Sequence, residues 1–205
     1  TEGSVEAAWD FRSHRWRPDV VKVTKDLAPA LIRWPGGVVT RYYRWKEGVG
    51  PRERRRPMHN VIWGGQESNQ VGTREFIECC RRVGADPLIA VNFEADGARG
   101  PLSDPAGRYR PAGPQEAAAW VDYCNNPANP LRRRHGVKEP YGVRLWQIGN
   151  EISYFKKGAY DCDTTAQRTV AFARAMRKRD PSIDLIGWGH GGWAPRMIEI
   201  AGEHL

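Results

Sequence analysis

The stretch Leu145-Trp146-Gln147-Ile148-Gly149-Asn150-Glu151 decides the fold of this chain, because a short apolar run ends in a glycine and two polar side chains. An apolar run of this length that stops at turn-forming residues predicts a buried β-strand. Asn150 and Glu151 then fall where the strand meets the next loop. A carboxylate beside an amide at the end of a buried strand indicates a site of chemistry, since rigid elements commonly present catalytic groups on the loops that follow them.

The same alternation of strand and helix recurs along the chain. Apolar runs predict four strands, at residues 30–34, 87–93, 143–148 and 183–188. Amphipathic segments predict helices around residues 18–27, 73–84, 117–124, 164–176 and 195–205. Thr73 is the predicted N-cap of the second helix, and Thr164 with Gln167 fits a capping box for the fourth. Residues 38–72 are rich in Gly, Pro and Arg and predict a long loop.

Consecutive strand-then-helix units imply parallel strands joined by right-handed crossovers. A doubly wound sheet and a β/α barrel share this signature, but no Gly-x-Gly-x-x-Gly follows any predicted strand, which argues against the doubly wound fold. Three strands end in polar tips, as the active-site end of a barrel requires: Arg33-Trp34, Asn92-Phe93-Glu94 and Asn150-Glu151. We therefore predict an α/β fold, a partial TIM (β/α)8 barrel of about four βα units that fills residues 1–205 as one catalytic domain.

Composition narrows the class of protein. The formal charge of +8 and the run Arg52-Glu53-Arg54-Arg55-Arg56 are compatible with nucleic-acid binding, but no nucleic-acid motif accompanies them, and we interpret the run as a solvated loop. No stretch approaches 18 apolar residues, so we expect no membrane span. The four cysteines and five histidines lack metal-site spacing, so we expect neither a metal nor a cofactor. Reduced thiols favour the cytoplasm.

Glu151 is the predicted catalytic residue. Apolar neighbours would desolvate its carboxylate, and desolvation raises a carboxyl pKa toward the range that is useful for a general acid. The amide of Asn150 is suited to hold a sugar hydroxyl. The alternative is that Asn150 and Glu151 only begin a loop, with the carboxylate solvated or capping.

Ordered motifs along the chain add a resemblance. Trp146 to Glu151 resembles the acid/base strand of clan A glycoside hydrolases, in which Asn-Glu closes the fourth barrel strand. Further motifs resemble family 51 α-L-arabinofuranosidases and follow in order over nearly all of residues 18–190: Leu31-Ile32-Arg33-Trp34-Pro35-Gly36-Gly37, Tyr43-Arg44-Trp45-Lys46, Gly48-Val49-Gly50-Pro51-Arg52, Trp63-Gly64, Glu67-Ser68-Asn69, Gly72-Thr73-Arg74-Glu75-Phe76, Val91-Asn92-Phe93 and Glu116 to Asn125.

The resemblance implies a retaining glycoside hydrolase that removes terminal arabinofuranosyl units from arabinose-containing oligosaccharides or polysaccharides. Glu151 would protonate the leaving oxygen and then act as base on water. Asn150 would bind the 2-hydroxyl of the sugar, and Arg33 would orient the catalytic carboxylates. Tyr154 would be a pocket wall or a loop anchor. The expected substrate-binding residues are Asn150, Arg33, Asn92, Trp63 and Tyr154.

The chain also departs from the family pattern. Val38 stands where the family usually has Asn or Cys, and the loop from Glu94 to Pro114 is longer than usual, which keeps another clan A glycosidase, such as a xylosidase or an endoglucanase, as an alternative. The strands correspond to the second to fifth of a barrel, so the nucleophilic Glu expected on the seventh strand is absent. Glu94 and Asp96 do not match its place.

Half a barrel leaves two strand edges unpaired, which favours association with another chain. The first residue is Thr1, so we expect a fragment of a longer protein that either self-associates or joins a complementary half. A non-catalytic carbohydrate-binding or assembly module is the alternative from another class of function.

Overall fold

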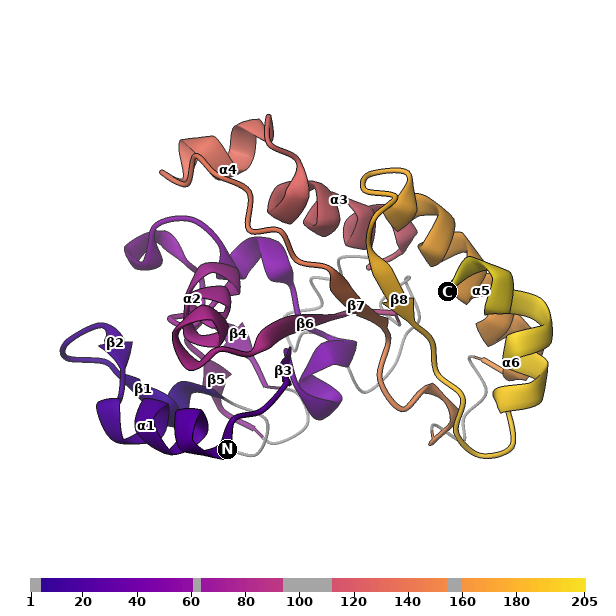
Figure 1. The fold of residues 1–205 in the computed structure, drawn as a ribbon, viewed down its shortest axis with the longest axis horizontal. Helices are drawn as coiled ribbons and strands as arrows, with labels where there is room; N and C mark the ends of the chain where they lie inside the picture. The colour runs from indigo at the N-terminus through magenta and orange to yellow at the C-terminus, as the bar shows by residue number, and fades with distance from the viewer. Residues whose placement is uncertain (1–4, 61–63, 94–111, 155–159) are drawn as a thin grey trace.

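The computed structural model describes residues 5–60, 64–93, 112–154 and 160–205. A sheet of four parallel strands in the order β3-β6-β7-β8 forms its centre (Figure 1). Its strands are Leu31–Trp34, Asp86–Val91, Leu145–Ile148 and Asp184–Ile186. Neighbours in the sheet follow one another in the chain, without the reversal of order that defines a doubly wound sheet. The strands therefore form part of a β/α barrel, as the sequence predicts.

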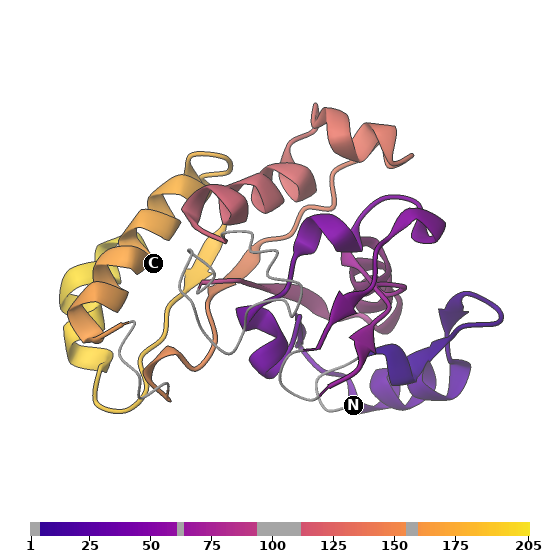
Figure 2. The same ribbon diagram turned by 180° about the vertical axis from the view of Figure 1, so that it is seen from behind.

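The helices lie along an arc outside the sheet, with α4 on the α2 side of α3 (Figure 1), and the view from behind shows the same arc (Figure 2). Helix α3 packs against α5, and α5 packs against α6. The helices are α1 Pro18–Leu27, α2 Thr73–Val83, α3 Pro114–Asn125, α4 Pro130–Arg134, α5 Cys162–Arg177 and α6 Ala194–Ala201.

The segment between β3 and α2 has more local structure than the long loop that the sequence predicts. It contains three 3-10 helices and a two-stranded antiparallel ladder: η2 Gly37–Arg41, η3 Trp45–Gly48, η4 Arg52–Arg54, β4 Met58–His59 and β5 Gln66–Glu67. Elements this short carry too few residues to show a hydrophobic period. The remaining short elements are η1 Val5–Ala8, the hairpin β1 Trp9–Asp10 and β2 Arg15–Trp16, η5 Ile152–Tyr154 and η6 Gly202–His204.

Both predicted N-caps are wrong. The N-cap of α2 is Gly72, whose N–H donates to the Glu75 carboxylate at 3.0 Å, while the Thr73 hydroxyl accepts from the Trp120 indole at 3.1 Å. The N-cap of α5 is Asp161, whose carboxylate accepts from the Thr164 N–H at 2.7 Å. That hydrogen bond lowers the pKa of Asp161. In each case a carboxylate, of Glu75 or of Asp161, accepts from a backbone N–H at the start of the helix. The sequence predicts a threonine hydroxyl in this capping role.

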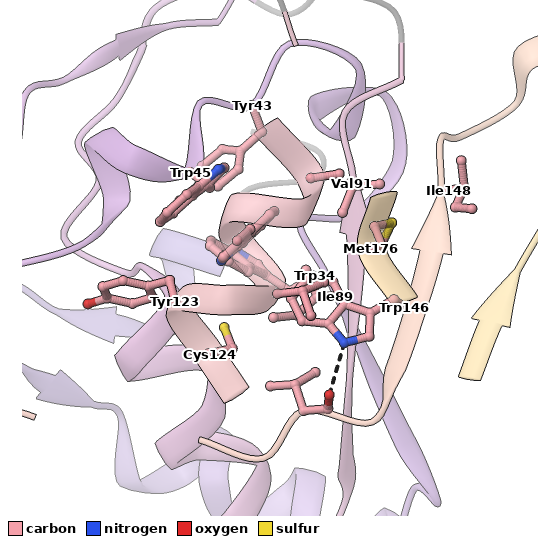
Figure 3. Packing of buried hydrophobic residues seen from close by; sticks show 14 of the residues in the cluster. Trp34, Tyr43, Trp45, Ile89, Val91, Tyr123, Cys124, Trp146, Ile148 and Met176 are labelled. Atoms are coloured by element: carbon pink, nitrogen blue, oxygen red, sulfur yellow. Dashed lines mark hydrogen bonds between the residues drawn. The ribbon is translucent and has the colours of Figure 1, made fainter. Parts of the chain in front are cut away.

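A row of side chains across the outer face of the sheet anchors the main core. Trp34, Ile89, Trp146 and Leu185 are opposite one another in register, and each is buried. The indole N–H of Trp146 donates to the Val143 carbonyl at 2.9 Å, so its polar atom is satisfied inside the core (Figure 3). Aromatic rings from the sheet and the helices thus form one continuous packed layer.

The Arg-rich run does not form the fully solvated loop that the sequence predicts. The side chain of Arg55 is 2% exposed and forms two hydrogen bonds with Glu75, at 2.7 and 3.0 Å. It also donates to the backbone carbonyls of Gly50, Asn69 and Gln70. A guanidinium buried with a carboxylate and three carbonyls fastens the loop to α2.

Candidate active site

The end of β7 turns the chain toward the predicted site. The N–H of Gly149 donates to the Val91 carbonyl at 3.1 Å, which continues the ladder to β6 one residue beyond the strand. Gly149 then takes a φ of +76°, and a side chain there would press on Ile152 and Phe93. Glycine is therefore required at this point, and the turn carries Asn150 and Glu151 to the carboxyl edge of the sheet.

Glu151 is half-buried and adopts a φ of +52°, in the left-handed region that non-glycine residues rarely occupy. Its carbonyl accepts from the N–H of Tyr154 at 3.0 Å and so closes the 3-10 turn η5. Backbone conformations of this kind cluster at functional sites because the surrounding structure must hold them in place. Glu151 thus combines an uncommon conformation with the strand-end position that the sequence predicts.

Arg33 on β3 reaches across the sheet to β7. Its Nη1 atom donates to Asn150 Oδ1 at 3.0 Å and to Gln147 Oε1 at 3.2 Å. Strand β6 lies between these two strands, and Ala90, the residue of β6 opposite Gln147, has only a methyl group. A small side chain at this position leaves room for the guanidinium to cross the inner face. Three strands therefore contribute to the geometry around Asn150.

The contact with Arg33 fixes the orientation of the Asn150 amide. A guanidinium has no acceptor, so the amide oxygen must face Arg33 and the NH2 group must face the other way. Asn150 is 3% exposed, and its Nδ2 has no hydrogen-bond partner in the described part of the chain. A buried donor without a partner is costly, so it is well placed to donate to a ligand oxygen.

Gln147 is a site residue that the sequence prediction missed. Its Oε1 accepts from Arg33, and its Nε2 donates to the Gly149 carbonyl at 2.6 Å. One amide therefore holds both the guanidinium and the peptide that precedes Asn150. The available signal was its place in the middle of an apolar strand, where a polar side chain requires a partner.

The other predicted site residues have separate environments. Asn92 is buried just after β6, and its Nδ2 donates to the Tyr43 carbonyl at 3.5 Å, which links it to the segment after β3. Tyr154 is 51% exposed, and its hydroxyl lies 3.2 Å from Nε2 of His190. Trp63, like Glu94 and Asp96, lies outside the described residues.

Buried polar contacts hold the segment that follows β3. The hydroxyl of Thr40 donates to the Pro35 carbonyl at 2.7 Å, and that of Tyr42 donates to Asn60 Oδ1 at 2.9 Å. Asn60 in turn donates to the Glu67 carboxylate at 2.7 Å. Burial, followed by the nearby Glu67 carboxylate, raises the pKa of Tyr42 to about 12, so its phenol stays a neutral donor. These contacts give the Tyr43 carbonyl, and with it Asn92, a fixed position.

The arrangement suits proton transfer next to a bound polar ligand. In the described part of the chain, Glu151 is the carboxylate that lies within the three residues after the carboxyl end of a strand of this sheet. Within the same ranges, no cluster of three His, Cys, Asp or Glu side chains is arranged to hold a metal ion, and no helix has the length and hydrophobicity needed to cross a membrane. All four cysteines are free, and burial raises the pKa of Cys80 to about 12.

Comparison with known proteins identifies relatives over most of the chain. The alpha-L-arabinofuranosidase 1 domain family matches residues 23–204. Alpha-L-arabinofuranosidase C of Emericella nidulans is 36% identical over 182 residues, which are 86% of this chain and 33% of that protein. The intracellular exo-alpha-(1->5)-L-arabinofuranosidase of Acetivibrio thermocellus is 36% identical over 203 residues, 93% of this chain and 37% of that protein. The chain thus spans about a third of the length of these relatives.

Solved structures agree. The α-L-arabinofuranosidase of Thermotoga maritima, solved as an arabinose complex, superposes with a TM-score of 0.77 at 33% identity over 98% of this chain and 39% of its own. The GH51 α-L-arabinofuranosidase of Thermotoga petrophila gives a TM-score of 0.78 at 33% identity, over 99% of this chain and 40% of its own. The predicted resemblance is confirmed, and the chain belongs to the alpha-L-arabinofuranosidase 1 domain family, as a partial β/α barrel of the family 51 type.

Proposed function

We propose that this chain carries the acid/base half of a retaining glycoside hydrolase that removes terminal α-L-arabinofuranosyl residues from arabinose-containing oligosaccharides or polysaccharides. The observation that supports it best is the Arg33–Asn150 contact beside Glu151. It directs the Asn150 NH2 group away from the guanidinium, as a donor to a sugar hydroxyl requires. Membership of the arabinofuranosidase family supports the same substrate class.

In the proposed reaction Glu151 acts twice. As a carboxylic acid it gives its proton to the glycosidic oxygen while a second carboxylate attacks the anomeric carbon, so the leaving sugar departs as an alcohol. As a carboxylate it then takes a proton from water, which displaces the second carboxylate and restores the acid. Asn150 donates to the 2-hydroxyl, where a hydrogen bond strengthens as the transition state develops. Arg33 holds Asn150, and Asn92, Trp63 and Tyr154 line the sugar site.

The second carboxylate is expected from the seventh strand of the completed barrel, outside this four-stranded sheet. The exposed fractions of Leu31 on β3 and Ile186 on β8, 47% and 41%, support a missing neighbour at each edge, because both side chains are apolar. A complementary half or a second copy of this chain would cover them, but a second copy would still lack the nucleophile. In a retaining enzyme the nucleophile then lies about 5 Å from the acid.

The proposed location is the cytoplasm. Free cysteines on α2, α3 and α5 are consistent with a reducing compartment. The relative from Acetivibrio thermocellus is named an intracellular enzyme, which supports the same location. Fractionation of the source cells would test it, and recovery from the culture medium would contradict it.

Hydrolysis of an aryl α-L-arabinofuranoside tests the proposed activity. Glu151→Gln keeps the size of the side chain and removes the transferable proton, so the rate is expected to fall by about 10²–10⁴-fold. Glu53→Gln is the matched control, because Glu53 is an exposed carboxylate on η4. Equal rates for the Glu151→Gln variant and the unsubstituted chain would show that this chain is not catalytic on its own, and would favour a non-catalytic carbohydrate-binding or assembly module.

A further inference from the structure

A cluster of three aromatic side chains lies beside the proposed acid, and two of them, Trp188 and His190, have no part in the reaction described above. Tyr154 ends η5, three residues after Glu151, and Trp188 and His190 follow β8. Strands β7 and β8 are parallel neighbours, so the segments that follow them emerge at the same edge of the sheet. The cluster therefore shares the carboxyl edge with Glu151.

The three rings pack on one another. Ring centroids lie 5.0 Å apart for Tyr154 and His190 and 5.8 Å apart for Tyr154 and Trp188, each in an edge-to-face arrangement. Trp188 and His190 are 5.8 Å apart. The Tyr154 hydroxyl lies 3.2 Å from His190 Nε2, and the Trp188 indole N–H donates to the Ser153 hydroxyl at 2.9 Å. Hydrogen bonds thus fix the direction of each ring that packing brings together.

This cluster is open to solvent in spite of its apolar area. Tyr154 is 51% exposed, His190 is exposed, and Trp188 is half-buried with one side against the main core. Aromatic side chains that only stabilise the fold are normally covered, as Trp120 and Trp146 are here at 2% and 0%. Rigid rings that stay exposed while a few polar atoms converge beside them are typical of ligand sites.

The position of the proposed acid determines which of the two linked sugars would lie against the three rings. A general acid must lie beside the oxygen that leaves, so the sugar on the leaving-group side of the bond has to lie next to Glu151. The apolar C–H faces of a sugar ring pack well on aromatic rings, and its hydroxyls bond with the polar tips of Tyr and His. We propose that Tyr154, Trp188 and His190 form a platform that binds the leaving-group sugar of an arabinofuranosyl oligosaccharide. This proposal rests on the proposed function, because the leaving-group sugar is placed next to the rings only if Glu151 is the general acid.

Binding without turnover tests the platform. The probe is an α-1,5-linked arabinotriose titrated calorimetrically into the Glu151→Gln protein. Adding Tyr154→Ala is expected to weaken binding by about two- to tenfold, the loss of one aromatic contact. Trp188→Phe keeps the ring and removes the hydrogen bond to Ser153, so a smaller loss is expected. Free L-arabinose has no leaving-group sugar, so its affinity is expected to stay unchanged in Trp188→Phe and to fall less than that of the triose in Tyr154→Ala.

Phe11→Ala is the matched control, since Phe11 is an aromatic residue of similar exposure, 48%, in the turn between β1 and β2. Unchanged triose affinity in Tyr154→Ala, equal losses in Phe11→Ala, or no triose binding to the starting protein would each overturn the platform. Failure of the proposed function would show separately, as arabinofuranoside hydrolysis that does not depend on Glu151.

Discussion

The two faces of the central sheet differ in their interactions: the outer face packs apolar side chains, and the inner face joins polar ones by hydrogen bonds. On the outer face, Trp34, Ile89 and Trp146 are at most 4% exposed and pack under the helices. On the inner face, the neighbouring positions Arg33 and Gln147 are half-buried and joined by a hydrogen bond. Successive residues of one strand therefore serve opposite purposes, because strand side chains alternate between the faces.

The difference teaches where the stability and the chemistry of this chain reside. Apolar burial on the outer face contributes most of the favourable free energy of folding. The inner face contains the polar side chains of Arg33 and Gln147. Their hydrogen bonds fix the position of Asn150. At the two edges of the inner face, the apolar side chains of Leu31 and Ile186 are exposed. They neither pack in the core nor bond to the groups around Asn150.

Removal of Trp120 is expected to have the largest effect. This α3 side chain is 2% exposed, lies within 6 Å of the rings of Trp34, Tyr43, Trp45 and Trp146, and donates to the Thr73 hydroxyl. Trp120→Ala should lower the free energy of unfolding by about 3–5 kcal/mol, through the cavity it leaves. Chemical denaturation measures this value. Trp120→Phe should lose less, and a loss below about 1 kcal/mol for the Ala variant would mean that the outer face does not carry the stability.

Changes on the inner face should have a smaller effect that depends on both partners. Arg33→Met leaves Gln147 Oε1 and Asn150 Oδ1 without their donor, at a cost of about 1–3 kcal/mol. Gln147→Met should cost less, because water reaches this half-buried position. Denaturation of both single variants and the double variant forms a double-mutant cycle, with an expected coupling of about 0.5–3 kcal/mol. Strict additivity would show that the two side chains stabilise the fold independently.

The sequence predicted the outer face well because it is built from continuous apolar runs. The strands at 30–34 and 143–148 lie within a few residues of their observed bounds, and the order of the sheet follows from the alternation of strand and helix. The position of Glu151 follows from the same reasoning, since the apolar run of β7 stops just before it. These features depend on local pattern and on the rules of parallel sheets.

The inner face could not be predicted in the same way. The contact between Arg33 and Asn150 joins residues 117 positions apart, and it depends on the small side chain of Ala90 between their strands. Burial of Arg55 has the same origin, because its partner Glu75 lies on another element. Tyr154 and His190 meet only because β7 and β8 are neighbours. Pairings of this kind are set by tertiary structure, which a local pattern does not contain.

The exposed edges should show the smallest effect on stability and a clear effect on association. Leu31→Lys and Ile186→Lys remove apolar side chains that are 47% and 41% exposed, so the free energy of unfolding should change by no more than about 0.5 kcal/mol. If the edges bind a second copy, a lysine on each should shift the sedimentation profile toward the single chain, because charged edge strands resist pairing. Phe11→Lys, which is distant from both edge strands in the chain and similarly exposed, should leave the profile unchanged. A loss of stability above 1 kcal/mol would show that Leu31 and Ile186 already pack against other residues of this chain. The two edges would then contribute to stability by apolar packing, as the outer face does.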